Sequence, residues 1–256
     1  MTAGLFDDLT DVYDAMIDWP KRLAYEEPFF RSVFDRAGAE RIVDVACGTG
    51  RHVAMFHSWG LDVEGSDISP NMIDRARASF GQSDRLRWAV RAFDEPIRTA
   101  RPFDVALCVG NSLALAPDFA VIRRALHEMM AAVRPGGLLV LQVLNLWRLT
   151  DGPCQWQKAR RTTLNEEEVL IVKGVHRCGS RGFVDLFVTP LPDIELHGDT
   201  AVFQGLEAVD LEQAAREEGA SSVECLGSYR RDSYDRRTSG DLILIAQKLA
   251  TPDRHE

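Results

Sequence analysis

Residues Arg41–His52, R-I-V-D-V-A-C-G-T-G-R-H, decide the fold of this chain. A β-branched apolar run ends in Gly48 and Gly50 and passes directly into a helical pattern, which predicts a strand, a tight turn and a helix start. Glycine supplies positive φ and lets the main chain approach a ligand closely. The first N–H groups of the following helix have no intrahelical partners and point at the same place. We therefore expect a small-molecule site built from backbone at this turn.

The same alternation of strand and helix continues on both sides of the turn and predicts an α/β fold with a doubly wound, seven-stranded, mostly parallel sheet of the Rossmann-like type. Two N-terminal helices precede the first strand, and Gly38 is expected to cap the second one. Expected strands cover 42–46, 61–65, 87–93, 103–109, 138–144, 222–229 and 241–247, and expected helices cover 4–17, 21–37, 50–59, the segment opened by Ser69-Pro70, 118–133 and 209–218.

After Asn145 the pattern changes to strand-like runs at 168–175 and 182–189, separated by a turn signal. An antiparallel insertion after the fifth strand would lie near the carboxyl edge of the sheet, where ligands bind, and would serve as a substrate cover. A hairpin that only closes the fold is the alternative. We expect a single domain over 1–256, composed of a helical cap (1–38), a cofactor-binding core (39–145), the insertion (146–205), the end of the core (206–248) and a flexible tail (249–256).

Composition limits the partners of the chain. Its 256 residues carry a formal net charge of −9, which argues against a broad basic surface for nucleic acid. Clusters of arginine and lysine at 158–161 and 230–237 are interpreted as solvated faces. No apolar run reaches the roughly 18 residues of a membrane span, and the acidic N-terminus does not resemble a signal peptide. Five cysteines without a C-x-x-C pair indicate reduced thiols in the cytoplasm.

The spelling D-x-A-C-G-T-G around the glycine turn resembles motif I of class I S-adenosylmethionine-dependent methyltransferases. A dinucleotide site is disfavoured because its third glycine is replaced here by Val53. In the methyltransferase family the acidic residue, here Asp44, helps to organise the turn and the methionine amino end of the cofactor. Ala46 stands where the first glycine is usual, so positive φ at that position is costly.

Two further segments extend this resemblance. In E-G-S-D-I-S-P-N-M, Asp67 follows the second strand and is expected to accept hydrogen bonds from ribose hydroxyls, although it could instead cap the next helix. The resemblance implies that Ile68 and Met72 also line the cofactor. After the third strand, Phe93 and Asp94 occupy the place where family members position a side chain against adenine; Phe93 is alternatively ordinary core.

The segment Val109-Gly110-Asn111-Ser112 resembles the glycine and sarcosine N-methyltransferase branch, which shares D-V-A-C-G-T-G and the later V-R-P-G-G-L-L-V. The N/D-P-P-Y/F tetrad of nucleobase methyltransferases is absent. The resemblance implies that Val109 and Asn111 contact the cofactor and that Asn111 orients an incoming amine. It also implies that Tyr13 and Arg22 reach the carboxylate and sulfonium side of the cofactor. Tyr13, which with Asn111 is a catalytic candidate, and Tyr25 are candidates for lid or substrate contacts, and Tyr25 is alternatively a core residue.

One departure from that branch concerns the acceptor. Its members carry an arginine before the Asn that follows the fifth strand, where it grips a substrate carboxylate; here that residue is Leu144. Arginines 148, 160 and 161 are candidate replacements. His52, just after the turn, is expected to pack or bind solvent, with a role as a base as the alternative, and the remaining histidines show no metal-ligand spacing.

The sequence therefore predicts an S-adenosylmethionine-dependent enzyme that methylates a small molecule, most simply the nitrogen of an amine. O- or C-methylation is the near alternative, and a module that binds the cofactor without transferring a methyl group is the other. No metal is expected, and the resemblance implies that homo-oligomers can form.

Overall fold

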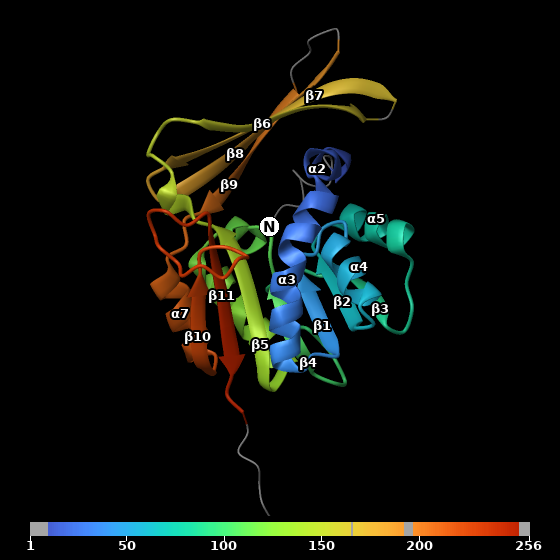
Figure 1. The fold of residues 1–256 in the computed structure, drawn as a ribbon, viewed down its shortest axis with the longest axis vertical. Helices are drawn as coiled ribbons and strands as arrows, with labels where there is room; N and C mark the ends of the chain where they lie inside the picture. Colours follow the sequence, from blue (N-terminus) through green and yellow to red (C-terminus); the bar gives the residue numbers. More distant parts are fainter. Residues whose placement is uncertain (1–9, 165, 192–196, 251–256) are drawn as a thin grey trace, which may run out of the picture.

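The computed structural model describes residues 10–164, 166–191 and 197–250. Within them, a seven-stranded sheet in the order β10-β11-β5-β4-β1-β2-β3 forms the centre of the molecule (Figure 1). Strand β11 runs antiparallel to both neighbours, and the other pairs are parallel, so the predicted fold class is confirmed. The strands are β1 (Arg41–Val45), β2 (Asp62–Asp67), β3 (Leu86–Val90), β4 (Phe103–Cys108), β5 (Val133–Leu144), β10 (Ala220–Leu226) and β11 (Asp241–Lys248).

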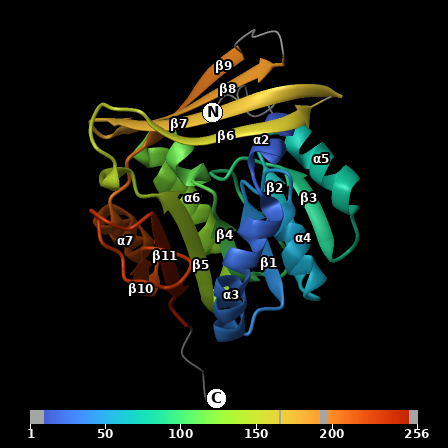
Figure 2. The same ribbon diagram turned by 45° about the horizontal axis from the view of Figure 1, so that its top comes forward.

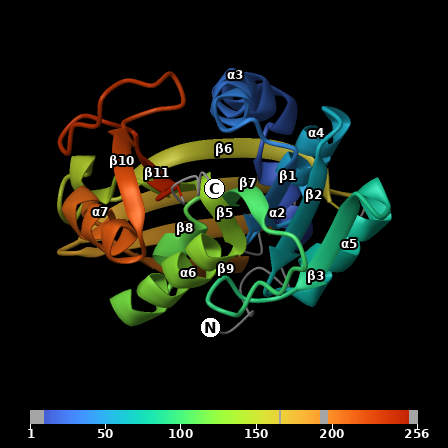
Figure 3. The ribbon, with the colours of Figure 1, turned by 90° about the horizontal axis from the view of Figure 1, so that it is seen from below.

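Helices cover both faces of this sheet, as its doubly apolar strands require. One face packs against α3 (Trp19–Ala37), α4 (Arg51–Ser58) and α5 (Pro70–Phe80). The other packs against α6 (Phe119–Ala132) and α7 (Ala208–Glu217), and Figure 3 shows α3 and α6 on opposite sides of the sheet. A short helix α2 (Thr10–Met16) precedes α3, and the single turns η1 (Ser112–Leu115) and η2 (Leu146–Arg148) follow β4 and β5.

Side-chain caps set the helix starts close to the predicted positions. Asp18 accepts a hydrogen bond from the backbone N–H of Lys21, so α3 begins at Trp19, two residues before the predicted start. Gly38 ends α3 in the left-handed conformation with φ 55°, as predicted. Of the expected first helix over 4–17, only the part from residue 10 lies within the described residues.

The insertion is a four-stranded antiparallel sheet in the order β6-β7-β8-β9 (Figure 2). We call it the inserted sheet; it consists of β6 (Gln155–Leu164), β7 (Glu167–Cys178), β8 (Arg181–Pro190) and β9 (His197–Gln204). The two central strands were predicted, whereas β6 and β9 were missed because their charged and polar residues show no apolar alternation. The inserted sheet also packs Val169 and Ile171 against Val12 of α2.

No helix among the described residues is both long enough and apolar enough to cross a membrane.

Candidate functional site

The glycine turn, Ala46–Gly50, connects β1 to α4 with three left-handed residues. Gly48 and Gly50 have φ of 56° and 78°, as predicted, and Ala46 adopts the costly φ of 59°. A Cβ on Gly50 would lie 2.5 Å from Cη2 of Trp88, so both the backbone conformation and the available space require glycine there. The turn is therefore held against β3 at the start of α4, where the first N–H groups of the helix have no intrahelical partners.

Asp67, at the end of β2, joins the turn to the next helix. One carboxylate oxygen accepts a hydrogen bond from Gly48 N–H at 2.9 Å, and the other accepts from Ser69 N–H at 3.0 Å. Ser69, not Asp67, caps α5 by accepting from the N–H of Met72. The interpretation of Asp67 as the helix cap is therefore wrong. Beside it, Ile68 is half-buried and Met72 is buried against the core.

Asp44 is the least satisfied polar group near the turn. Its side chain lies on β1 and is 1% exposed, and neither carboxylate oxygen has a hydrogen-bond partner. Burial, together with the charges of nearby Asp67 and Glu26 and against the opposing charge of Arg22, raises the pKa of Asp44 to about 8. A buried carboxylate is normally paired with a cation or a hydrogen-bond donor, and Asp44 has neither bonded to its oxygens. The ammonium group of a methionine-containing cofactor has that chemistry, so the residues present fit the group that the sequence predicts.

A buried ion-pair cluster connects α3 to α4 beside this carboxylate. Glu26 accepts from Arg22 at 2.9 Å and lies 2.6 Å from Nε2 of His52. Burial raises the pKa of Glu26, but the hydrogen bond and the charge of His52, together with Arg22, outweigh it and lower the pKa overall. The His52 ring packs against Trp19 and Phe30, so its interpretation as a packing residue is confirmed.

A cavity of about 190 Å³ lies where the carboxyl ends of β4 and β5 meet the inserted sheet. We call it the junction cavity; it is lined by Arg22, Gly110, Asn111, Gln142, Leu144, Gln157, Lys173, Val175 and Val184. The inserted sheet thus covers the edge of the central sheet at which parallel α/β proteins bind ligands, rather than extending the fold elsewhere.

Gly110, Asn111 and Gln142 form the polar floor of this cavity, and hydrogen bonds hold them in place. Gln142 accepts from the N–H of Gly110 at 2.7 Å and donates to Asp241 at 2.8 Å. Asn111 has φ 71°, and its side-chain oxygen accepts from Leu144 N–H at 2.8 Å. The oxygen predicted to orient an amine is therefore already bonded to β5 and keeps one lone pair for a further donor.

Several predicted residues lie away from this floor. Strand β3 ends at Val90, and Phe93 is 5% exposed and belongs to the core that packs under α6. Asp94 accepts from Arg124 of α6 at 3.1 Å, and Val109 is buried in the core on the α3 side.

Two predicted tyrosines have different outcomes. Tyr25 is 44% exposed and packs edge-on against Tyr229, so it is not a core residue. Tyr13 lies in α2, and its side chain is outside the part of the chain that the structure describes. The candidate replacement arginines also lie elsewhere: residues 148, 160 and 161 are exposed, whereas the cations that line the junction cavity are Arg22 and Lys173.

Sequence reasoning missed Tyr229, which follows β10. The residue is 7% exposed, and its hydroxyl has no hydrogen-bond partner. Burial raises the pKa of Tyr229 well above its ordinary range, and Glu26, Asp241 and Asp44 act in the same direction against Arg22. The ring of Tyr229 packs against Phe29 and Phe30 of α3, the helix that also carries Glu26. It lies 185 positions after Asp44, and no local pattern marks it.

Comparison with known proteins agrees with this geometry. Residues 42–137 match the family described as Methyltransferase domain. The chain is 35% identical over 150 residues to glycine/sarcosine N-methyltransferase of Parasynechococcus marenigrum (strain WH8102), covering 57% of this chain and 52% of that protein. It is 30% identical over 141 residues to glycine N-methyltransferase of Rattus norvegicus, covering 50% and 48%. The chain thus spans about half the length of these curated relatives.

Solved structures match over nearly the whole chain. The sugar N-methyltransferase KedS8 from Streptoalloteichus has a TM-score of 0.76 at 21% identity and covers 97% of this chain and 96% of its own. The CcbJ methyltransferase from Streptomyces caelestis has a TM-score of 0.76 at 18% identity, with 96% and 97% covered. At these identities the likeness concerns the fold, inserted sheet included. Together with the match of residues 42–137 to the Methyltransferase domain family, it shows a methyltransferase-type fold around the glycine turn.

Proposed function

We propose that this protein transfers the methyl group of S-adenosylmethionine to the nitrogen of a small amine held in the junction cavity. The observation that carries the proposal is the buried, unpartnered carboxylate of Asp44 beside a turn that Asp67 holds open. The bound cofactor supplies a methyl group activated by a sulfonium. The names of the relatives, which methylate glycine, sarcosine or sugar amines, support nitrogen as the acceptor atom.

We assign the cofactor to the core, 39–145 and 206–248, and the acceptor to the cover formed by the helical cap and the insertion, 146–205. In this assignment Asp44 binds the ammonium group, the backbone of Ala46–Gly50 approaches the cofactor, and Asp67 receives the ribose. The N-terminal helices contribute Arg22 and Tyr13. Ile68, Met72, Phe93, Asp94 and Val109 remain proposed neighbours of the cofactor, the buried ones acting by shaping the pocket walls.

The junction cavity suits catalysis by positioning. An amine that arrives neutral needs alignment and exclusion of water rather than a strong base, and positioning alone supplies roughly 7–11 kcal/mol of barrier reduction. The bonds between Asn111 and Leu144, and between Gln142 and Gly110, keep the polar floor rigid. The inserted sheet closes the opposite side. Arg22, which also pairs with Glu26, and Lys173 line this cavity, and we assign the binding of an anionic group on the acceptor to them in place of the missing arginine.

The test has two parts. Calorimetric titration with S-adenosylmethionine and S-adenosylhomocysteine should show binding of both, and Asp67→Ala should weaken it tens-fold while Asp74→Ala, exposed on the next helix, should not. Transfer of labelled methyl groups to a panel of amino acids, amino sugars, phenols and carboxylic acids then identifies the acceptor. Amine products that Lys173→Met strongly reduces, without loss of cofactor affinity, support the proposal. Binding without transfer to any acceptor would make the protein a cofactor-binding module.

A further inference from the structure

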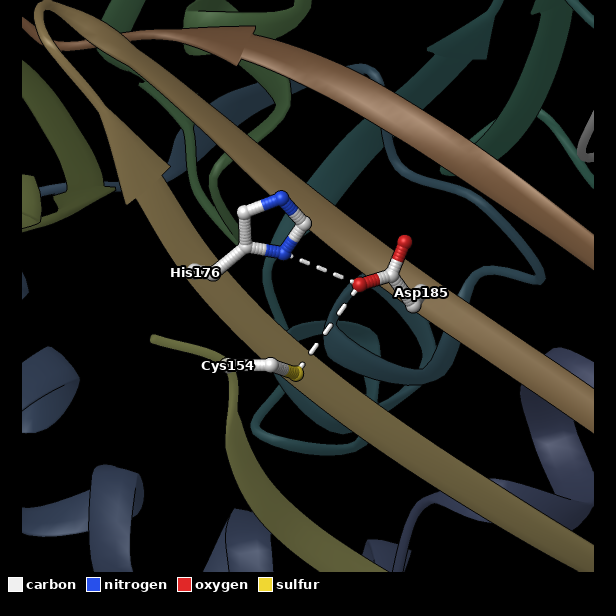
Figure 4. Close-up of side chains that lie close together, drawn as sticks. All are labelled: Cys154, His176 and Asp185. Carbon is white, nitrogen blue, oxygen red and sulfur yellow. Dashed lines mark hydrogen bonds and ion pairs between the residues drawn. The ribbon is translucent and has the colours of Figure 1, made fainter. Parts of the chain in front are cut away.

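Three side chains of different chemistry meet on the face of the inserted sheet that points away from the junction cavity. Val175 and Val184 line that cavity, and side chains alternate between the faces of a strand, so His176 and Asp185 point to the other side. Cys154, directly before β6, joins them there (Figure 4). The sequence shows no metal-ligand spacing because these residues come from three separate segments that only the sheet brings together.

The distances match those between the ligands of one metal ion. Nδ1 of His176 lies 3.0 Å from Oδ2 of Asp185, Sγ of Cys154 lies 3.9 Å from the same oxygen, and all three atoms lie within 4.8 Å of one another. Tetrahedral Zn²⁺, with bonds of about 2.0–2.3 Å, separates such ligands by roughly 3.3–3.6 Å. Shifts of a few tenths of an ångström would place the three atoms around one ion.

The orientation of the His176 imidazole supports a metal ion placed between the three side chains. Nδ1 of His176 is buried, and although Asp185 is near, the geometry gives it no hydrogen bond. Two groups that face a common point rather than each other would show this arrangement. The ring is fixed by stacking on Phe183, with 4.7 Å between centroids and 7° between planes.

Neighbouring residues hold the other two ligand groups. Thr200 donates its hydroxyl hydrogen to the second oxygen of Asp185 at 2.8 Å and so orients the carboxylate, as outer partners of metal ligands commonly do. A Cβ on Gly174 would lie 2.5 Å from Sγ of Cys154, so the absence of a side chain there makes room for the sulfur.

We propose that Cys154, His176 and Asp185 bind Zn²⁺ through Sγ, Nδ1 and a carboxylate oxygen, with water as the fourth ligand. A thiol, an imidazole and one carboxylate favour zinc over magnesium or calcium, which prefer oxygen ligands only. On binding, the thiol releases its proton to solvent and the thiolate bonds to the metal. The ion would fasten the segment that enters β6 to β7 and β8, behind the wall of the junction cavity. This inference stands independently of the proposed methyl transfer.

Titration of the metal-free protein with Co²⁺ tests the site, because a thiolate ligand gives cobalt an intense ultraviolet charge-transfer band. We expect one equivalent to bind with that band and Zn²⁺ to displace it. Cys154→Ser should abolish the band and Asp185→Asn should weaken binding at least tenfold. Cys178→Ser, which removes an exposed thiol at the end of β7, should change neither. Absence of the band, or its survival in Cys154→Ser, would overturn the proposal.

A second measurement needs no variant and covers the case in which Cys154→Ser does not fold. The unaltered protein is treated with iodoacetamide with and without Zn²⁺, and the modified cysteines are identified by peptide mass. Zinc should slow alkylation of Cys154 at least tenfold and leave Cys178 unaffected. Equal alkylation of Cys154 in both samples would show that the cluster is only an ion pair beside a thiol.

Discussion

Replacing Asp44 with Asn should stabilise the cofactor-free protein. Burial and the neighbouring carboxylates raise the pKa of Asp44 from 3.8 to about 8, so at pH 7 the folded state binds a proton that the unfolded state has lost. Stability therefore falls by about 1.4 kcal/mol for each pH unit between the two pKa values. At pH 7 the accumulated cost is of the order of 4 kcal/mol. Asparagine is uncharged in both states and avoids it.

Urea unfolding of both proteins without cofactor, at pH 5 and pH 7, measures this effect. The stability advantage of Asp44→Asn should grow by about 3 kcal/mol between these pH values, and each kcal/mol corresponds to about 2–4 °C in melting temperature for a chain of this size. The same variant should bind S-adenosylmethionine far more weakly. In the unaltered protein, cofactor binding at pH 7 should release a proton, which calorimetry in two buffers of different ionisation enthalpy detects.

Asp104→Asn is the matched control on the neighbouring strand β4. Burial raises the pKa of Asp104, but hydrogen bonds from Arg134 and from the N–H groups of Glu40 and Arg41 outweigh it and lower the pKa overall. This variant should therefore be destabilised at pH 7, and its deficit should shrink as the pH falls through the acidic range. If Asp44→Asn were less stable at both pH values, or if its advantage did not change with pH, the carboxylate would be charged and partnered, and the reasoning would fail.

Three further outcomes follow from the site. Asp67→Asn replaces one of the two acceptor oxygens that hold the turn and α5, so cofactor affinity should fall tens-fold in calorimetry, and unchanged affinity would remove Asp67 from the site. Gly50→Ala places a Cβ against Trp88 at φ 78° and should cost about 2 kcal/mol or more in urea unfolding, whereas wild-type stability would mean that the turn relaxes freely. His52→Leu removes one partner of buried Glu26 and should cost about 1–3 kcal/mol, most of it recovered when Glu26→Leu is added; no recovery would locate the loss in packing instead.

The fold was predictable where burial dominates the sequence. Strands β4 and β5 are buried on both faces, so they appear as apolar runs that need no knowledge of their neighbours. Strand β6 was missed because its residues are mostly exposed and charged, and its pairing with β7 rests on backbone hydrogen bonds that leave no apolar pattern. The end of β3 was placed three residues late because Phe93 extends the apolar pattern beyond the last ladder pair.

The candidate site likewise has a part that local sequence predicts and a part that it does not. The glycine turn and Asp67 lie within one strand–helix–strand unit, so their spacing along the chain fixes their spacing in the structure. The residues that line the junction cavity do not lie within one such unit, because Lys173 and Gln157 come from the inserted sheet. Tyr229 likewise comes from the far end of the chain. Which of these side chains meet depends on how the inserted sheet and the last strands pack, and local sequence does not encode that packing.

The two ends of the insertion touch each other. A Cβ on Gly205 would lie 2.7 Å from Cδ2 of Leu146, and the indole N–H of Trp147 donates to the carbonyl of Leu206 at 3.0 Å. A segment that leaves and rejoins a domain at one point can be lengthened, shortened or exchanged without moving the rest. Under the proposed function, acceptor choice and cofactor capture reside on separately replaceable pieces of one chain, so evolution or engineering can change the substrate while leaving the source of the methyl group untouched.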